Sequence, residues 1–332
     1  MIALERVTKR FGSWTAVDAV SMTVEEGEFL VLVGPSGSGK STLLRMMNRL
    51  IAPDSGIIRV DGADIAGLPP EALRRRMGYV IQSVGLFPHW TVERNIATVP
   101  DLLGWPRARV RDRVTELLEL LKLDPRRFRT AYPHQLSGGQ QQRVGVARAL
   151  AAEPRVLLMD EPFSALDPIT RGALQGEMAA IHRGTGTTIV FVTHDMDEAL
   201  ALADRVAVMD HGRLVQCAPP LAILTDPASG MVRDLVGREE WGLKRLAVET
   251  VARRVRPEPA IPPIPGPPVS SATPLHRALS EMVARGADRL PVVDGEGRPA
   301  GVLHLADLVR DPSAPPPVSP PVSPPVSPPV SP

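Results

Sequence analysis

The residues Gly34-Pro35-Ser36-Gly37-Ser38-Gly39-Lys40-Ser41-Thr42 follow directly after the apolar run Phe29–Val33 and lead into a helical pattern. They match the spacing G-x-x-x-x-G-K-[ST]. Glycines let successive backbone amides curl around a phosphate, and the start of the next helix presents further amides and its positive dipole end to the anion. The stretch therefore predicts a strand, a nucleotide phosphate loop and a helix. We expect Lys40 to reach the β- and γ-phosphates and Ser41 to bind Mg²⁺.

A second apolar run, residues 155–159, ends in two carboxylates, Asp160 and Glu161. Two acids at the end of a buried strand are costly unless a cation or a proton transfer uses them. We expect Asp160 to hold Mg²⁺ through water and Glu161 to polarise the attacking water as a general base. Both could instead cap the next turn, but the phosphate loop upstream favours the catalytic interpretation.

Short β-branched runs alternate with amphipathic helical patterns through the first 240 residues. The strands predicted are apolar along their whole length, which is typical of a parallel sheet covered on both faces. Residues 84–152 have few strand signals and are predicted to form a helical insert. The predicted strands are 28–33, 78–82, 155–159, 187–192 and 205–210, and the predicted helices are 40–50, 107–122, 138–152 and 169–183.

Charge and hydropathy exclude several classes of protein. The 38 Lys and Arg nearly cancel the 37 Asp and Glu, for a net charge of +1, which argues against a nucleic-acid binder. Every apolar run is much shorter than the roughly 20 residues of a membrane-spanning helix, and the start shows no secretory signal. The single cysteine, Cys217, cannot form an internal disulfide, so a reducing cytosol fits. We expect Cys217 to be a small buried filler.

A third motif lies between the first two. The residues Leu136-Ser137-Gly138-Gly139-Gln140 precede a helical run, with Ser137 as a natural N-cap. Two glycines at a helix start permit an anion to approach the amides closely. The chain therefore offers a second phosphate-binding surface.

This combination resembles the ATP-binding subunit of ATP-binding-cassette (ABC) transporters over about residues 1–240. The resemblance implies an α/β P-loop NTPase fold of ABC type, with a parallel-sheet core, an antiparallel β edge and a helical subdomain at about 84–152. It also implies that the signature Leu136 to Gln140 of one subunit closes over ATP held by the phosphate loop of another, so that the chain works as a homodimer.

Further landmarks of the family occur in the expected order. Gln82 matches the glutamine that senses Mg²⁺ and the attacking water, and His194 matches the switch histidine at the γ-phosphate. The residues from Ser164 to Asp167 match the loop that crosses the dimer interface. Phe11 stands where the family keeps an aromatic residue to stack on adenine, although a core role for it is an open alternative.

A narrower resemblance comes from residues 78–89, 91–96 and 102–105, which look like ATPases of importers for glycine betaine, carnitine or choline. It implies ATP-driven uptake of a quaternary-amine osmoprotectant through separate membrane permease subunits, served by an extracellular or periplasmic binding protein. The chain would then lie at the cytoplasmic face of the cell membrane, without a nucleic-acid partner. An importer ATPase for another small solute, such as an amino acid, and a non-transport ABC ATPase are the alternatives.

Proline divides the rest of the chain. Of the 36 prolines, most of the excess lies in two clusters, at 257–274 and 312–332. Residues 273–311 predict a helix, two strands and a helix, and resemble one cystathionine-β-synthase-type (CBS) regulatory unit. Residues 243–256 could supply its first part, so that 241–311 form a single unit with a Pro-rich insertion at 257–268. This unit either senses a ligand or is a docking or vestigial domain.

The chain ends in a tail, residues 312–332, that repeats Pro-Pro-Val-Ser. We expect it to be disordered and to favour polyproline II. It would then serve as a spacer or as a ligand for an aromatic-lined groove.

Overall fold

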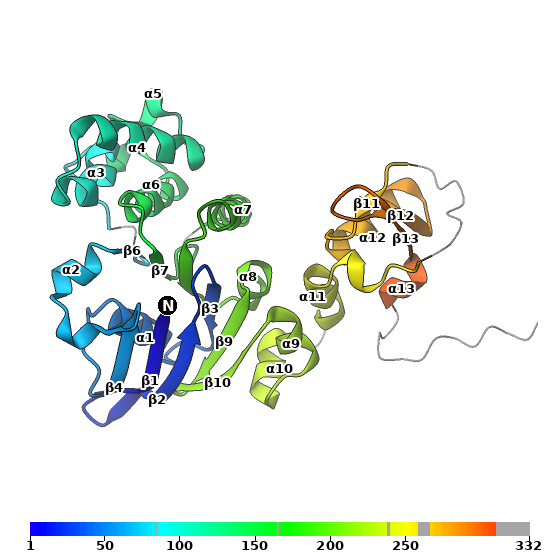
Figure 1. The fold of residues 1–332 in the computed structure, drawn as a ribbon, viewed down its shortest axis with the longest axis horizontal. Coiled ribbons are helices and arrows are strands. Elements are labelled where there is room, and N and C mark those ends of the chain that lie inside the picture. Colours follow the sequence, from blue (N-terminus) through cyan, green and yellow to red (C-terminus); the bar gives the residue numbers. More distant parts are fainter. Residues whose placement is uncertain (84, 165, 238–239, 258–265, 310–332) are drawn as a thin grey trace, which may run out of the picture. The chain divides into compact units, whose positions relative to one another are not determined.

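The computed structural model describes residues 1–83, 85–164, 166–237, 240–257 and 266–309, and the predicted tail at 312–332 lies outside them, as does most of the predicted insertion (Figure 1). The described residues divide into two compact units, one up to Val248 and one from Glu249 onward. We describe each unit by itself.

The first unit is built around a six-stranded sheet in the order β10-β9-β3-β8-β7-β6. Its strands from β9 to β6 pair in parallel, and β10 pairs with β9 in the antiparallel sense. This confirms the predicted parallel core. The strands are β3 (Phe29–Val33), β6 (Met77–Val80), β7 (Val156–Asp160), β8 (Thr188–Val192), β9 (Arg205–Asp210) and β10 (Arg213–Ala218).

Both faces of this sheet are covered. In β3, Phe29, Val31 and Val33 belong to one apolar core, and Leu30 and Leu32 belong to a second core on the opposite face. Such alternation requires cover on both sides because successive side chains of a strand point in opposite directions. Helix α1 (Lys40–Met47) packs in the second core, and helices α4 (Arg107–Leu120), α6 (Gly138–Leu150) and α7 (Pro168–Thr185) contribute to the first.

An antiparallel sheet flanks the parallel one, in the order β2-β1-β4-β5. The long strands β1 and β2 form a hairpin whose register ends with Phe11 opposite Trp14. The sequence pattern did not predict this hairpin. Its register shifts at three places, and these shifts interrupt the two-residue alternation of buried and exposed side chains. Its strands are β1 (Ile2–Phe11), β2 (Trp14–Val24), β4 (Ser55–Val60) and β5 (Ala63–Asp64).

Between β6 and β7 the chain is helical, as predicted for this segment (Figure 1). Helices α3 and α4 pack on each other and on α6, around a core that includes Ile96, Val114, Leu117 and Val146. The helices are α3 (Val92–Leu102), α4 (Arg107–Leu120), α5 (Pro125–Phe128) and α6 (Gly138–Leu150).

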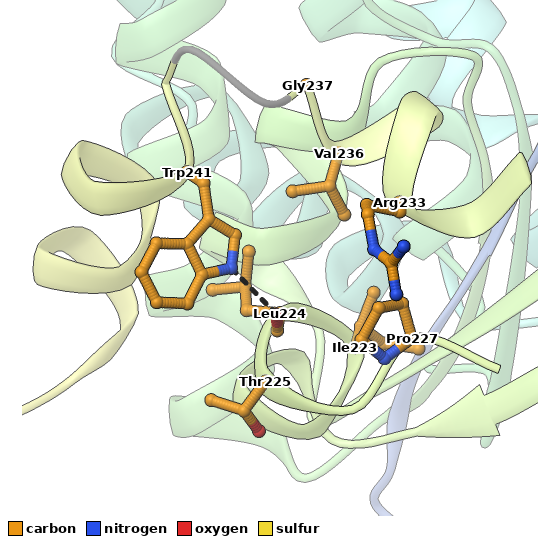
Figure 2. A pocket seen from close by; sticks show the side chains of 8 residues that line it. All are labelled: Ile223, Leu224, Thr225, Pro227, Arg233, Val236, Gly237 and Trp241. Atoms are coloured by element: carbon orange, nitrogen blue, oxygen red, sulfur yellow. Dashed lines mark hydrogen bonds between the residues drawn. The ribbon is translucent and has the colours of Figure 1, made fainter. Parts of the chain in front are cut away.

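The remaining helices of the first unit precede β6 or follow β7. They are α2 (Pro70–Arg74), α7 (Pro168–Thr185), α8 (Met196–Leu202), α9 (Pro220–Thr225), α10 (Gly230–Val236) and α11 (Trp241–Val248). Helix α11 joins α9 through Trp241, whose Nε1 donates to the Leu224 carbonyl at 2.8 Å (Figure 2). Trp241, Leu224, Ile223 and Val236 line an apolar pocket of about 340 Å³, with Arg233 at its side.

Among its described residues, the second unit contains a three-stranded sheet in the order β11-β12-β13, two α-helices and a short 3-10 helix at Val251–Arg253. The predicted succession of helix, strand, strand and helix is confirmed as α12, β12, β13 and α13. Residues 250 and 256 join the unit through bridges to Pro274 and Val302. The elements are β11 (Val269–Ser270), α12 (Leu275–Arg285), β12 (Arg289–Val293), β13 (Pro299–His304) and α13 (Leu305–Val309).

No helix among the described residues is both long and apolar enough to span a membrane.

Candidate nucleotide site

The phosphate loop joins the end of β3 to the start of α1. Gly39 caps the helix at φ 99°, and a Cβ there would collide with the Ala16 carbonyl oxygen. Glycine is therefore required for both the backbone conformation and the close approach. The loop places the first amides of α1 at its centre, which is the arrangement that binds phosphate.

Lys40 lies within this loop. Its side chain is buried, and Nζ donates to the carbonyl oxygens of Gly34 and Pro35 at 2.8 Å each. Burial lowers the pKa of Lys40, while the carboxylates of Glu161 and Asp160 act to raise it. The ammonium group is thus held in the loop, within the electrostatic influence of two acids, at the point where phosphate charge would be neutralised.

The side chains of Ser41, which follows β3 and the loop, and Asp160, which ends β7, meet at one edge of the sheet. The Ser41 hydroxyl donates to Asp160 Oδ1 at 2.6 Å, and Arg45 Nη2 lies 3.6 Å from Oδ2. The Asp160 side chain is only 4% exposed, so its charge is largely withdrawn from water. One carboxylate and one hydroxyl are oxygen donors of the kind that Mg²⁺ takes from proteins when phosphates and waters supply its other ligands. The residues therefore fit this ion.

Three polar side chains converge next to the loop. Gln82 Nε2 donates to Glu161 Oε2 at 3.3 Å, and His194 Nδ1 lies 3.4 Å from the same oxygen. Glu161 has φ 44°, which is uncommon for a residue with a Cβ. This backbone conformation follows directly on the end of β7, and the Glu161 amide donates to the Val192 carbonyl at 3.0 Å.

These groups line one cavity of about 520 Å³. It brings together residues that are far apart in the sequence, as expected for the carboxyl ends of parallel strands. The sequence predicted all of its lining residues except Trp14. They are Trp14, Ser36, Gly37, Gly39, Lys40, Ser41, Thr42, Gln82, Glu161 and His194.

The aromatic residue at the cavity is Trp14. Phe11, expected to stack on adenine, packs beside it with ring centroids 6.1 Å apart and an interplanar angle of 25°. Both side chains are about half exposed, and Phe11 is absent from the cavity lining. If the hairpin had been predicted, the place of Trp14 at its end would have indicated an exposed aromatic side chain near the phosphate loop.

The signature residues form the start of α6. Ser137 Oγ accepts from the Gln140 amide at 3.3 Å, and Gln140 Oε1 accepts from the Ser137 amide at 2.9 Å. This reciprocal pair is a capping box, which confirms Ser137 as the N-cap. The cavity of the phosphate loop is lined by none of the residues from Leu136 to Gln140 of the same chain.

Asp167 caps α7 through a bond from the Thr170 amide to Oδ1 at 3.0 Å. Hydrogen bonds from Thr170 lower the pKa of Asp167. Ser164 is tied to the site, because its hydroxyl donates to the Glu161 carbonyl at 3.0 Å.

Comparison with known proteins identifies the family. The chain is 56% identical to the glycine betaine uptake system ATP-binding protein of Escherichia coli over 309 residues, which cover 93% of this chain and 99% of the relative. The chain belongs to the ABC transporter ATP-binding family. The family model for ABC transporters matches residues 17–164, and the CBS domain model matches residues 260–313.

A second relative and a solved ABC cassette agree. The chain is 46% identical to a glycine betaine/carnitine/choline transport ATP-binding protein of Bacillus subtilis, over 89% of this chain and 76% of that protein. It is 34% identical, with a TM-score of 0.60, to a dimeric ATP-binding cassette bound to ADP and Pi in a post-hydrolysis state, covering 66% of this chain and 99% of that one. This ABC protein is thus an ATP-binding and ATP-hydrolysing subunit, of a kind that works as a dimer with membrane permease subunits.

Proposed function

We propose that this ABC subunit hydrolyses ATP to drive the import of a quaternary-amine osmoprotectant of the glycine betaine, carnitine or choline class. The observation that carries the proposal is the convergence of Lys40, Ser41 and the Glu161–Gln82–His194 group in one cavity, with Asp160 bonded to Ser41. The solute class is supported by the near full-length similarity to the glycine betaine uptake protein.

ATP binds with its phosphates on the loop from Gly34 to Thr42. Lys40 already faces the loop carbonyls, so it can turn to the β- and γ-phosphates with little change in its surroundings. Trp14 offers its exposed ring to the adenine, with Phe11 supporting it from the side. Ring stacking of this kind accepts any base, so the phosphates supply most of the recognition.

Ser41, Asp160 and Gln82 would hold Mg²⁺. When bound, the ion neutralises charge on the β- and γ-phosphate oxygens. The hydrogen bond between Ser41 and Asp160 orders both side chains in advance, since each restricts the other.

Glu161 is the general base. Its carboxylate accepts a proton from the attacking water while the water oxygen bonds to the γ-phosphorus and ADP leaves. Gln82 orients the water, and His194, which lies against the same carboxylate oxygen, contacts the γ-phosphate. The two side chains hold Oε2 of Glu161 between them.

A second copy of the chain completes the site. Ser137 and Gly139 at the start of α6 present amides to the γ-phosphate of the partner's ATP, and the loop ending at Asp167 lies at the interface between the copies. Hydrolysis removes the phosphate that both copies share. The copies then part at the cytoplasmic face of the membrane and drive the permease. An extracellular or periplasmic binding protein delivers the solute to the opposite face of the permease.

Uptake in a reconstituted system tests the proposal. The chain would be assembled in proteoliposomes with its membrane permease subunits, with ATP inside and the binding protein outside. We expect ATP-dependent uptake of labelled glycine betaine or choline, lost with Glu161→Gln. Uptake of an amino acid in place of any quaternary amine would contradict the solute class while leaving the ATPase assignment standing.

A further inference from the structure

The structure assigns a positioning role to Arg171, which ties the loop before Asp167 to the turn that carries His194. Arg171 belongs to no motif recognised in the sequence. The inference rests on the proposed function, because it concerns how the switch histidine is held.

Arg171 lies in the first turns of α7 and contacts both loops with one guanidinium group. Its Nη2 donates to the Leu166 carbonyl at 3.2 Å. Its Nη1 lies 3.5 Å from Asp195 Oδ2, and its Nε lies 3.9 Å from Glu198 Oε1. The guanidinium is planar and rigid, so a displacement of one contact is passed to the others.

The turn of His194 is fixed on both sides by the partners of Arg171. The Thr193 hydroxyl donates to Glu198 Oε2 at 2.7 Å and accepts from the Asp195 amide at 3.0 Å. Asp195 Oδ1 accepts from the amide of Asp197 at 2.8 Å. Thr193 and Glu198 are buried. A buried carboxylate needs such partners, so Glu198 anchors the turn strongly.

Hydrogen bonds rather than apolar packing set the place of His194. Its side chain is 59% exposed. A polar cavity of about 10 Å³ lies beside it, bordered by Glu161, Ser164, Arg171, His194 and Glu198. That volume is about enough for one water molecule. A displacement of Leu166, next to the interface residue Asp167, therefore displaces the turn of His194 through Arg171. Arg171 thus links closure of the dimer to the position of His194.

A double-mutant cycle tests this link. We would measure single-turnover ATP hydrolysis and nucleotide affinity for Arg171→Ala, His194→Ala and the double variant. Misplacing a catalytic group by about 1 Å can cost roughly a hundredfold in rate, so we expect Arg171→Ala to lower the rate about ten- to a hundredfold. In the His194→Ala background the same change should cost less than about twofold, because residues that act as a unit are not additive.

Nucleotide affinity and the unfolding midpoint of Arg171→Ala should stay close to those of the control Arg59→Ala, which removes an exposed ion pair with Glu5. Equal losses in both backgrounds would overturn the inference, as would a loss of nucleotide binding that matches the loss of rate. If His194→Ala itself leaves the rate unchanged, the role proposed for His194 is wrong as well. If His194→Ala lowers the rate and the effects of the two substitutions are additive, only the link through Arg171 is refuted.

Discussion

Ser41 at the start of α1 donates its hydroxyl proton to Asp160 at the end of β7, at 2.6 Å, although 119 positions separate the two residues. The bond joins the phosphate loop to the strand that ends directly before Glu161, the proposed general base. Because the parallel sheet places β7 and the loop after β3 at the same edge, two separate sequence motifs become one site.

Removing either member of this pair should weaken the use of Mg²⁺. We expect Asp160→Asn to raise the Mg²⁺ concentration for half-maximal ATP hydrolysis at least about tenfold, equivalent to about 1.4 kcal/mol. Titration with Mg²⁺ at saturating ATP measures it. Ser280→Ala, which removes an exposed hydroxyl in α12, is the control and should leave the titration unchanged. An unchanged requirement in Asp160→Asn would contradict the assignment of the metal ligand.

Trp14, rather than Phe11, should carry the stacking on adenine. Base–aromatic stacking is worth about 1–3 kcal/mol, so Trp14→Ala should weaken ATP binding by at least about fivefold. Phe11→Ala should have the smaller effect, because it only supports the Trp14 ring. Equilibrium binding of a fluorescent ATP analogue compares them. A larger loss for Phe11→Ala would restore the role that the sequence alone suggested.

The second unit depends on a buried ion pair. Arg254 donates to both Glu249 carboxylate oxygens, at 2.9 and 2.8 Å, and the two side chains are 6% and 2% exposed. Breaking a buried pair costs about 3–5 kcal/mol, so Glu249→Ala should increase hydrogen exchange throughout this unit of the full chain. Glu281→Ala, which breaks an exposed pair with Arg285 in α12, should cost about 0–1 kcal/mol. Similar exchange in the two variants would show that burial does not strengthen the pair.

Much of the site could be predicted because its chemistry is local. A strand, a glycine loop and a helix start follow one another in Gly34 to Ser41, and Asp160 and Glu161 end an apolar run, so residue type and spacing were enough. The roles of Trp14 and Arg171 could not be predicted, because they depend on non-local geometry. Trp14 reaches the site through the irregular register of the β1–β2 hairpin, and Arg171 meets Asp195 and Glu198 only once α7 and α8 have packed.

Helix boundaries shifted for a similar reason. The helical pattern at 40–50 continues beyond Met47, but α1 ends there with Arg49 at φ 50°. Arg74, from a different element, donates to the Arg49 carbonyl at 2.8 Å. Tertiary contacts of this kind decide where a helix ends, and the local pattern does not contain them.

We propose above that Glu161 is the base of an ATPase site shared between two copies of the chain. The most direct measurement is sedimentation of Glu161→Gln with ATP and Mg²⁺, together with its turnover. We predict a stable ATP-bound dimer and a rate at least about a hundredfold below the wild type, the range expected for loss of general-base catalysis. Glu153→Gln, at an exposed pair with Arg109, should behave as the wild type. Normal turnover by Glu161→Gln would contradict the role of Glu161 as the base, and a chain that stays monomeric with ATP would contradict the shared site.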